Sequence, residues 1–265
     1  MANFDINNFV IDRVVRGVAL SQKDDSVLFS INQMQNVSLN CASESTDAVD
    51  ALGTPIATFY RAKSAEFSAE NALFDMNLMA TQLGTKKEVA GNGDKVIVPA
   101  METFIVEEGK EYTLKHAPIT APTEIYALNS DSTFGVKYSK TKETNPAKNE
   151  FAISGQVITL PADVAVGDEM FVMYEYQATE AVEVVNSATN FPVGCKFVME
   201  VLGCDVCDQT NLIYAYVVFP NFKLSPDFDW SVATDGAHPF SGKAQQDYCD
   251  REKKLFSIII PGDQE

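Results

Sequence analysis

The chain has 265 residues, of which 46% are hydrophobic, and a formal net charge of −17 at pH 7. A chain of this length buries roughly 70–75% of its unfolded surface, so it needs neither a disulfide nor a metal for stability. Acids outnumber bases 37 to 20, which argues against a binding site for a nucleic-acid backbone. The acidity fits two interpretations: a surface that repels a passing polyanion, and simple solubility.

No apolar run is long enough to cross a bilayer, and the start of the chain lacks the features of a secretion signal. We therefore expect a protein without a membrane partner that is made in a cytoplasm, or assembled there. The five cysteines are scattered and odd in number, so reduced thiols are expected.

The first quarter of the chain has an extended pattern. Strands are expected over these ranges: Phe4–Ala19, Ser26–Ser38 and Thr58–Phe67. Between the last two, Leu39–Gly53 is small, polar and acidic, so it is predicted to be a long loop. Long loops in compact domains are often functional, and Glu44, Asp47 and Asp50 are therefore candidate contact residues.

A helix is predicted over Ala69–Leu83. Ser68 can cap its first turn, Glu70 complements the helix dipole, and Gly84 can supply the left-handed residue that ends it. One face is apolar at helical spacing, as a helix packed on a sheet requires. This face consists of Ala72, Leu73, Met76, Met79, Ala80 and Leu83.

On the opposite side of the predicted helix, Phe74 and Leu78 form an i, i+4 pair among polar neighbours. A single packing face would leave this pair in water. Three explanations stay open: a loop of the same chain covers the pair, the pair stays exposed, or another subunit covers it. The last explanation makes Phe74 and Leu78 candidate subunit-interface residues.

The middle of the chain changes composition after a predicted hairpin over Glu102–Lys115. From Ala117 to Val185, short strand patterns alternate with Asn, Asp, Gly and Pro turns, and no helical period intervenes. This pattern is typical of a β-sandwich. We therefore predict two domains: a discontinuous β core over residues 1–116 and 186–265, and a small immunoglobulin-like insert over 117–185.

The C-terminal third returns to strand patterns. They are expected over Lys196–Leu202, Asn211–Phe219 with Pro220 as its end, Asn221–Leu224, Phe228–Val232 with Trp230 inward, and Leu255–Ile260. Asn211–Phe219 is apolar on both faces, which predicts a central strand. The fold class is thus mainly β with one α-helix: a β-sandwich or barrel with a flanking helix, plus the insert.

Chemistry-bearing motifs are sparse. Cys204 and Cys207 form a single CxxC, which could supply half of a zinc site with Cys195, Cys249 or His238. Small buried thiols explain lone cysteines as well, so no metal or cofactor is predicted.

No nucleotide-binding or hydrolase motif is present. His116 and His238 fit hydrogen-bonded or surface roles, and Asp227 with Asp229 fits a solvated strand face better than a glycosidase pair. The sequence predicts no enzyme and no catalytic residue.

The order of elements resembles the major tail tube proteins of tailed bacteriophages. The residues that carry the resemblance are Gly53-Thr-Pro-Ile56 through Arg61-Ala-Lys63 to Asn71-Ala-Leu73 and Gln82-Leu-Gly84, with His238-Pro-Phe-Ser-Gly and Lys254-Leu-Phe-Ser-Ile near the end. The resemblance covers about Ile11–Gly84 and Phe197–Pro261, and it leaves the insert and the CxxC unexplained.

The resemblance implies a virion protein that forms stacked, hexameric rings around an acidic channel for DNA. Its partners would be copies of itself, other tail proteins and passing DNA that is not specifically bound. Leu39–Gly53 would reach a neighbouring ring, sheet edges would pair around the ring, and the insert would project outward.

Two other classes remain open at this point. One is another virion component, such as a head decoration or sheath-associated β-protein. The other is a carbohydrate- or surface-binding β-module, in which Trp230 and the tyrosines of Glu169–Tyr176 would stack on the ligand.

Overall fold

The computed structural model describes residues 6, 8–91, 95–234, 236–248 and 251–262. The protein is mainly β, with 56% of residues in strands, and its curled sheets form a half-barrel. The chain divides into two compact units, residues 1–87 with 184–265 and residues 88–183. Each unit is considered by itself.

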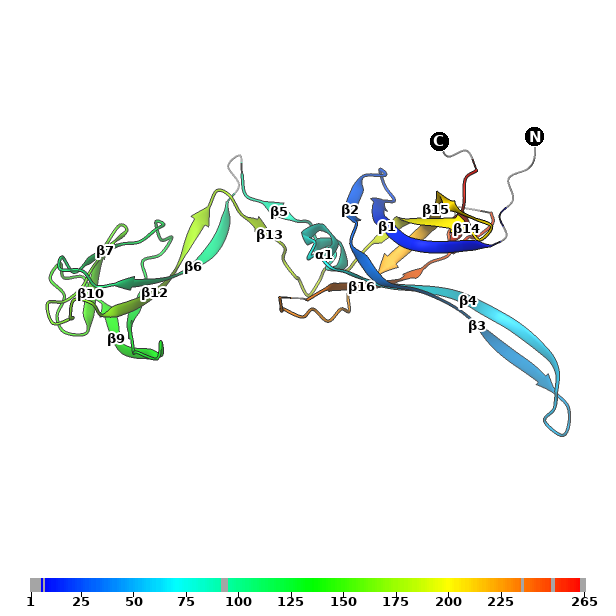
Figure 1. The fold of residues 1–265 in the computed structure, drawn as a ribbon. Coiled ribbons are helices and arrows are strands. Elements are labelled where there is room, and N and C mark those ends of the chain that lie inside the picture. The colour runs from blue at the N-terminus through cyan, green and yellow to red at the C-terminus, as the bar shows by residue number, and fades with distance from the viewer. Residues whose placement is uncertain (1–5, 7, 92–94, 235, 249–250, 263–265) are drawn as a thin grey trace. The chain divides into compact units, whose positions relative to one another are not determined.

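The first unit is built on an 8-stranded antiparallel sheet with the order β2-β1-β14-β15-β16-β4-β3, in which β17 also pairs with β15 (Figure 1). Its strands are β1 Phe9–Ser21, β2 Val27–Ile31, β3 Met34–Val49, β4 Pro55–Asn71, β14 Gly194–Asp205, β15 Asp208–Leu224, β16 His238–Ala244 and β17 Ser257–Ile259. Residues 4, 5 and 7 of the expected first strand lie outside the described part of the chain.

Phenylalanine rings from distant strands form the core of the first unit. Phe67 of β4 lies 5.4 Å from Phe197 of β14 and 5.8 Å from both Phe219 and Phe240, measured between ring centroids. All four rings are buried. Such contacts join strands that are far apart in the sequence, so the curled sheet closes over one apolar interior.

The helix is shorter than the sequence predicts. α1 spans Met76–Gln82, and Asp75 caps it by accepting a 2.7 Å hydrogen bond from the Leu78 amide. The predicted start at Ala69 was wrong, because Ser68 to Asn71 continue strand β4 and pair with β16. Only the end of the helix matches the prediction: Gly84 has φ +67°, in the left-handed region.

Gly84 is also a point of close approach. A Cβ at this position would lie 2.3 Å from the backbone carbonyl of Phe191. Both the positive φ and this contact require glycine, because a side chain would collide with backbone that cannot yield.

Two other expectations in the first unit were wrong. Pro220 does not end a strand, because β15 continues through it to Leu224. At this point β15 has a bulge, since its register against β14 shifts between Cys195 and Phe197. A bulge tolerates a residue that lacks an amide hydrogen. Phe228–Val232 is not a strand, and Trp230 is 43% exposed instead of inward-facing.

The second unit contains a 7-stranded sheet with the order β6-β12-β8-β9-β10-β11-β7 and a separate two-stranded β13-β5 ribbon. The strands are β5 Glu88–Val89, β6 Val96–Ile105, β7 Glu111–Thr113, β8 Glu124–Leu128, β9 Phe134–Lys140, β10 Glu150–Ser154, β11 Val157–Thr159, β12 Glu169–Ala178 and β13 Val182–Glu183. The hairpin predicted over Glu102–Lys115 was wrong, because β6 and β7 are at opposite ends of the strand order and do not pair. Both strands belong to this unit and not to the expected core domain.

A buried carboxylate joins three strands of the second unit. Glu102 of β6 accepts hydrogen bonds from the hydroxyls of Tyr112 on β7, at 2.7 Å, and Tyr174 on β12, and from the Lys115 amide at 3.1 Å. Burial opposes ionisation of Glu102, but these donors outweigh it and lower the pKa. β6 and β7 are the two end strands of this sheet and form no backbone ladder with each other. The side chain of Glu102 therefore joins the two end strands.

Candidate assembly interface

The most exposed element of the first unit is the distal half of the β3–β4 hairpin, which we call the arm and define as residues 43–62. The predicted loop at Leu39–Gly53 was wrong: most of it belongs to β3, which pairs with β4 along its length. Every residue of the arm is exposed, and Figure 1 shows the hairpin running out from the rest of its sheet. No residue of the arm therefore contributes a buried side chain to the core of the unit.

The arm carries apolar side chains that nothing in the described chain covers. Leu52 is 92% exposed and Tyr60 72% exposed. Further exposed apolar residues are Val49, Ile56 and Phe59. An isolated two-stranded hairpin is marginally stable in water, and clustered exposed apolar residues mark interaction sites. The arm thus has the properties of a segment that docks on another molecule.

Asp50 organises the tip of the arm. Its carboxylate accepts hydrogen bonds of 2.8 Å from the Leu52 amide and 2.9 Å from the Thr54 amide, and Gly53 has φ +86°. Hydrogen bonds from these amides, that of Thr54 first, lower the pKa of Asp50. Asp50 therefore has a turn-forming role.

Glu44 and Asp47 lie on β3 of the arm, where Glu44 is opposite Arg61 and Asp47 is opposite Thr58 in the register. Both acids are exposed. The register shifts next to Glu44, because β4 has one more residue than β3 at the base of the arm. Ala62 of β4 lies in this bulge and has φ 47°. Such bulges bend a strand pair and so direct the arm away from the sheet.

The structure separates the two predicted interface residues, Phe74 and Leu78. Leu78 is 0% exposed and belongs to the core of its own unit, so it needs no neighbouring subunit. The prediction failed because the helix is buried on more than one side. Five successive residues are buried: Leu78, Met79, Ala80, Thr81 and Gln82.

Phe74 precedes the helix and is 40% exposed. Its ring stacks on Trp230 at 4.6 Å and on His238 at 5.2 Å, between centroids. His238 is buried, and its Nε2 lies 2.7 Å from Gln82 Oε1, while Nδ1 accepts from the Asp75 amide at 3.4 Å. Burial lowers the pKa of His238, so a neutral ring supports this aromatic stack.

Besides the end strands β2 and β3 of the sheet, β1 and β17 also have backbone edges without a ladder partner among the described residues. β1 pairs with β2 only at Gly17–Leu20, which leaves the side of residues 9–16 away from β14 open. β17 pairs with β15 on one side only. Open edges are templates for pairing with another chain.

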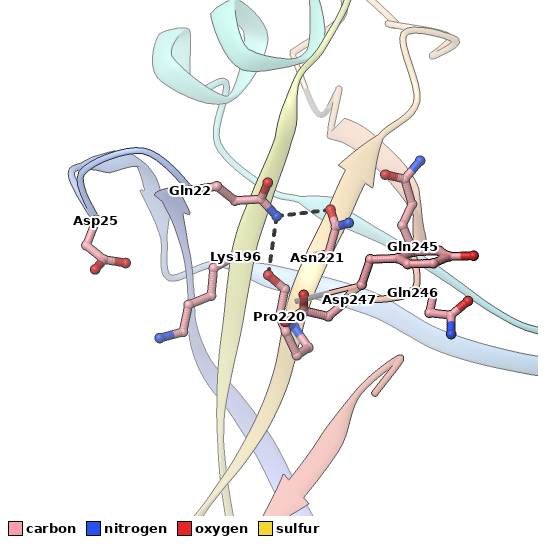
Figure 2. A pocket seen from close by; sticks show the side chains of 9 residues that line it. Gln22, Asp25, Lys196, Pro220, Asn221, Gln245, Gln246 and Asp247 are labelled. Atoms are coloured by element: carbon pink, nitrogen blue, oxygen red, sulfur yellow. Dashed lines mark hydrogen bonds between the residues drawn. The ribbon is translucent and has the colours of Figure 1, made fainter. Parts of the chain in front are cut away.

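A polar depression of about 830 Å³ lies beside β15 (Figure 2). Gln22 Nε2 donates to Asn221 Oδ1 at 3.0 Å and approaches the Pro220 carbonyl at 3.4 Å. Other lining residues are Asp25, Lys196, Gln245, Gln246, Asp247 and Tyr248. The depression is open and lined by amides and opposite charges, without a nucleophile and base placed for catalysis.

The remaining candidates do not converge on a reactive centre. Cys204 is buried in β14 and Cys207 is exposed in the following turn. Among the described residues no group of three or more metal-ligating side chains occurs, and Cys249 lies outside them. No helix in the described chain is long and apolar enough to span a membrane.

The residues proposed for sugar stacking are also largely occupied. Tyr174 is buried against Glu102, and the ring of Tyr176 stacks on His116 at 3.9 Å. Trp230 stacks on Phe74. The aromatic residues on which the carbohydrate-binding alternative depended are therefore engaged in contacts within the chain.

Sequence reasoning missed the apolar residues at the arm tip. Leu52, Ile56 and Tyr60 do not follow one face of a strand that is half buried. The available signal was Asp50 followed three residues later by Gly53, two turn-favouring residues flanked by residues of strand propensity.

A comparison with known families matches residues 9–258 to the YomU/Tube protein family. No curated protein matches the chain. The family is one of structural phage tube proteins and is not an enzyme family. It implies self-assembly, other tail proteins as partners and a place in the virion tail. The match spans the 8-stranded sheet from its first strand in the sequence, β1, into its last, β17, together with the whole second unit, and the chain belongs to the YomU/Tube protein family.

Proposed function

We propose that this chain is the repeating subunit of a tail tube, in which hexameric rings of subunits stack around a channel through which DNA passes. The observation that carries the proposal is the arm, a paired strand hairpin whose every residue is exposed. A lone monomer gains nothing from ordering such a segment, whereas a polymer can bury it.

In the proposed assembly, the arm contacts a subunit of the neighbouring ring. Leu52, Ile56 and Tyr60 supply the apolar area, and Glu44 and Asp47 are available at the rim for polar contacts. Asp50 acts indirectly, because its hydrogen bonds to the turn amides set the shape of the tip.

Ring closure is assigned to the open edges of β1 and β17. Strand addition at these edges would pair backbone groups that otherwise face water, and a closed ring leaves no edge free for uncontrolled aggregation. Phe74 is a further candidate contact, since it remains 40% exposed at the start of the helix.

The net charge of −17 per chain gives a ring a strongly negative field. A negative wall repels the phosphate backbone, so DNA passes without a binding site that would retain it. Assembly in the host cytoplasm before incorporation into the virion tail is part of the same proposal.

The test removes the arm. Residues 43–63 are replaced by Asn-Gly, which joins the paired residues Ala42 and Ser64 through a two-residue turn. We expect the excised chain to keep the thermal midpoint of the natural chain, because the arm adds nothing to the core, and to form no stacked tubes in negative-stain micrographs. Tubes of normal length from the excised chain would contradict the role of the arm.

A matched control keeps the arm and changes a residue of the second unit. Val182→Lys alters an exposed residue of β13 and is expected to leave both folding and tube formation unchanged. Loss of tubes in both variants would indicate that polymerisation is sensitive to any change in the chain, and would remove the support that arm excision gives.

A further inference from the structure

The arm and the helix of the first unit lie at opposite ends of one strand. β4 begins in the arm at Pro55 and ends at Asn71, and α1 follows after a short turn. At about 3.3 Å per residue, this 17-residue strand separates its two ends by roughly 50 Å. Figure 1 shows the arm and α1 on opposite sides of the unit. Subunits that repeat head to tail therefore bring the arm of one copy to the helix end of the next.

Two chain segments that meet beside α1 expose apolar side chains at this end. Gly84, just after the helix, lies so close to Phe191 that an added Cβ would be 2.3 Å from the Phe191 carbonyl. The side chains of Phe191 and Val193 are 65% and 66% exposed. Lys86 and Lys87 follow Gly84 and are also exposed. We call Lys86, Lys87, Phe191 and Val193 the helix-end patch.

We propose that the helix-end patch is the surface on which the arm of a second copy of this chain docks. The proposal rests on the proposed function for the position of that copy in the neighbouring ring, and it adds the surface that receives the arm. The contact is heterologous: each subunit provides an arm at one end and receives an arm at the other. Such a contact continues from subunit to subunit without closing, as a stack of rings requires.

Charge favours this pairing. Within residues 43–62, the arm, acids outnumber bases three to one. The segments that form the patch, residues 84–87 and 184–193, carry two lysines and no acid, although acids outnumber bases 37 to 20 in the whole chain. The next acids along the chain, Glu88 and Glu183, belong to the second unit. Opposite charge on the two surfaces steers their encounter and selects against other pairings.

The arm also provides the area that a docking contact requires. Its roughly 20 residues are all exposed, and a standard stable interface uses about 20–30 residues on each side. Leu52 and Tyr60 are its most exposed apolar residues. Phe191 and Val193 supply apolar side chains for the centre of the contact, and the two lysines lie where an interface has its polar rim.

A second apolar cluster at the helix end is a poorer receiver. Trp230 stacks on Phe74 just before the helix, and Trp230 and Val232 are 43% and 83% exposed. Asp227 and Asp229 are exposed next to them in the chain, so an acidic arm would meet like charge there. The helix-end patch, in contrast, combines apolar side chains with positive charge.

The test exchanges charges between the two surfaces in the full chain. One variant carries Lys86→Glu with Lys87→Glu, a second carries Glu44→Lys with Asp47→Lys, and a third carries all four changes. We expect each of the first two to lower the amount of sedimented tube by about tenfold or more, because like charges then meet. The third should restore the tubes, because the arm and the patch are again opposite in charge. All four residues are exposed, so the thermal midpoint should stay unchanged.

A matched control reverses the same number of charges away from the patch. Lys142→Glu with Lys148→Glu changes two exposed lysines of the second unit and is expected to leave tube formation unchanged. Normal tubes from the Lys86→Glu, Lys87→Glu variant would overturn the proposal, and so would a lack of restoration in the variant with all four changes. An equal loss in the control would also overturn it, because net charge and not the patch would then govern stacking.

A mixture distinguishes failure of this proposal from failure of the tube proposal. The arm-excised chain retains the patch, and the Lys86→Glu, Lys87→Glu chain retains the arm, so the two together can form one arm–patch contact. Sedimentation velocity is expected to show association in the mixture beyond that of either chain alone. If the excised chain does not fold, the Glu44→Lys, Asp47→Lys chain takes its place, because its basic arm fits the acidic patch of the other variant.

The two proposals then fail in different ways. Tubes from the natural chain without association in the mixture would remove the docking surface and leave the tube. Association in the mixture without tubes from the natural chain would retain the docking surface and remove the stacked rings.

Discussion

The arm and the body of the first unit belong to the same strands but differ in what covers them. In the body, β4 alternates between buried Ala65, Phe67 and Ala69 and exposed residues between them. In the arm, both faces of the same strand are exposed. The difference teaches that strand pairing continues where the core ends, and we have proposed that another subunit covers the uncovered part.

The sharpest way to test this difference is the same substitution in both regions. Leu78→Asp places a carboxylate where the side chain is 0% exposed, and an unpaired buried charge costs several kcal/mol or neutralises by a large pKa shift. We expect a loss of roughly 3–5 kcal/mol in the free energy of unfolding, enough to unfold a marginal unit, measured by urea titration of intrinsic fluorescence.

Leu52→Asp is the matched change in the arm. Leu52 is 92% exposed, so the free energy of unfolding should change by less than about 0.5 kcal/mol. Tube formation should nevertheless decrease, because a charge now sits in the proposed contact. Equal destabilisation by Leu52→Asp and Leu78→Asp would show that the arm is part of the core and that the distinction is wrong.

Glu102 provides a second contrast, between a carboxylate that belongs to the fold and the exposed carboxylates of the arm. Glu102→Gln replaces one acceptor oxygen by a donor that faces tyrosine hydroxyls. We expect the second unit to lose about 1–3 kcal/mol of stability, followed by near-ultraviolet circular dichroism. Glu44→Gln in the arm should cost nothing measurable.

The pH dependence has a defined sign. The pKa of Glu102 is lowered from its ordinary 4.5, so its contribution to stability is present above pH 4.5 and is lost as the pH falls through the lowered value. The pKa values of Tyr112 and Tyr174 are raised to about 12, so their contribution is present below pH 10 and is lost as the pH approaches 12. Acid unfolding that is identical in Glu102→Gln and the natural chain would contradict this account.

An effect smaller than that of Leu78→Asp is expected at Phe74, at the border of covered and uncovered surface. Phe74→Ala removes the stacks with Trp230 and His238, which are worth about 0.5–1.5 kcal/mol each beyond buried area. Because the ring is 40% exposed, we expect a loss of about 1–2 kcal/mol and a red shift in Trp230 emission as this indole gains solvent. A loss as large as that of Leu78→Asp would place Phe74 in the core.

The sequence predicted the covered parts of the fold better than the uncovered parts. The β-rich class and the helix end at Gly84 were confirmed. The helix start failed because Ala65, Phe67, Ala69 and Asn71 alternate in burial as a strand, while the residues after Phe67 also fit a helical period.

The arm was missed for a physical reason. Periodicity indicates which face of a strand is buried. A hairpin that no described part of its own chain covers has no buried face, and so gives no such pattern. Leu39–Gly53 therefore reads as a loop, although β3 pairs with β4 through most of it. The acidic residues were identified, but the role of Asp50 in the turn depends on hydrogen bonds that the pattern does not reveal.

The most direct test of the central claim is negative-stain electron microscopy of the purified full chain over a range of concentrations. Our account predicts rings and stacked hollow tubes with a continuous channel. A chain that stays monomeric at every concentration, with the arm protected from proteolysis by its own body, would contradict it.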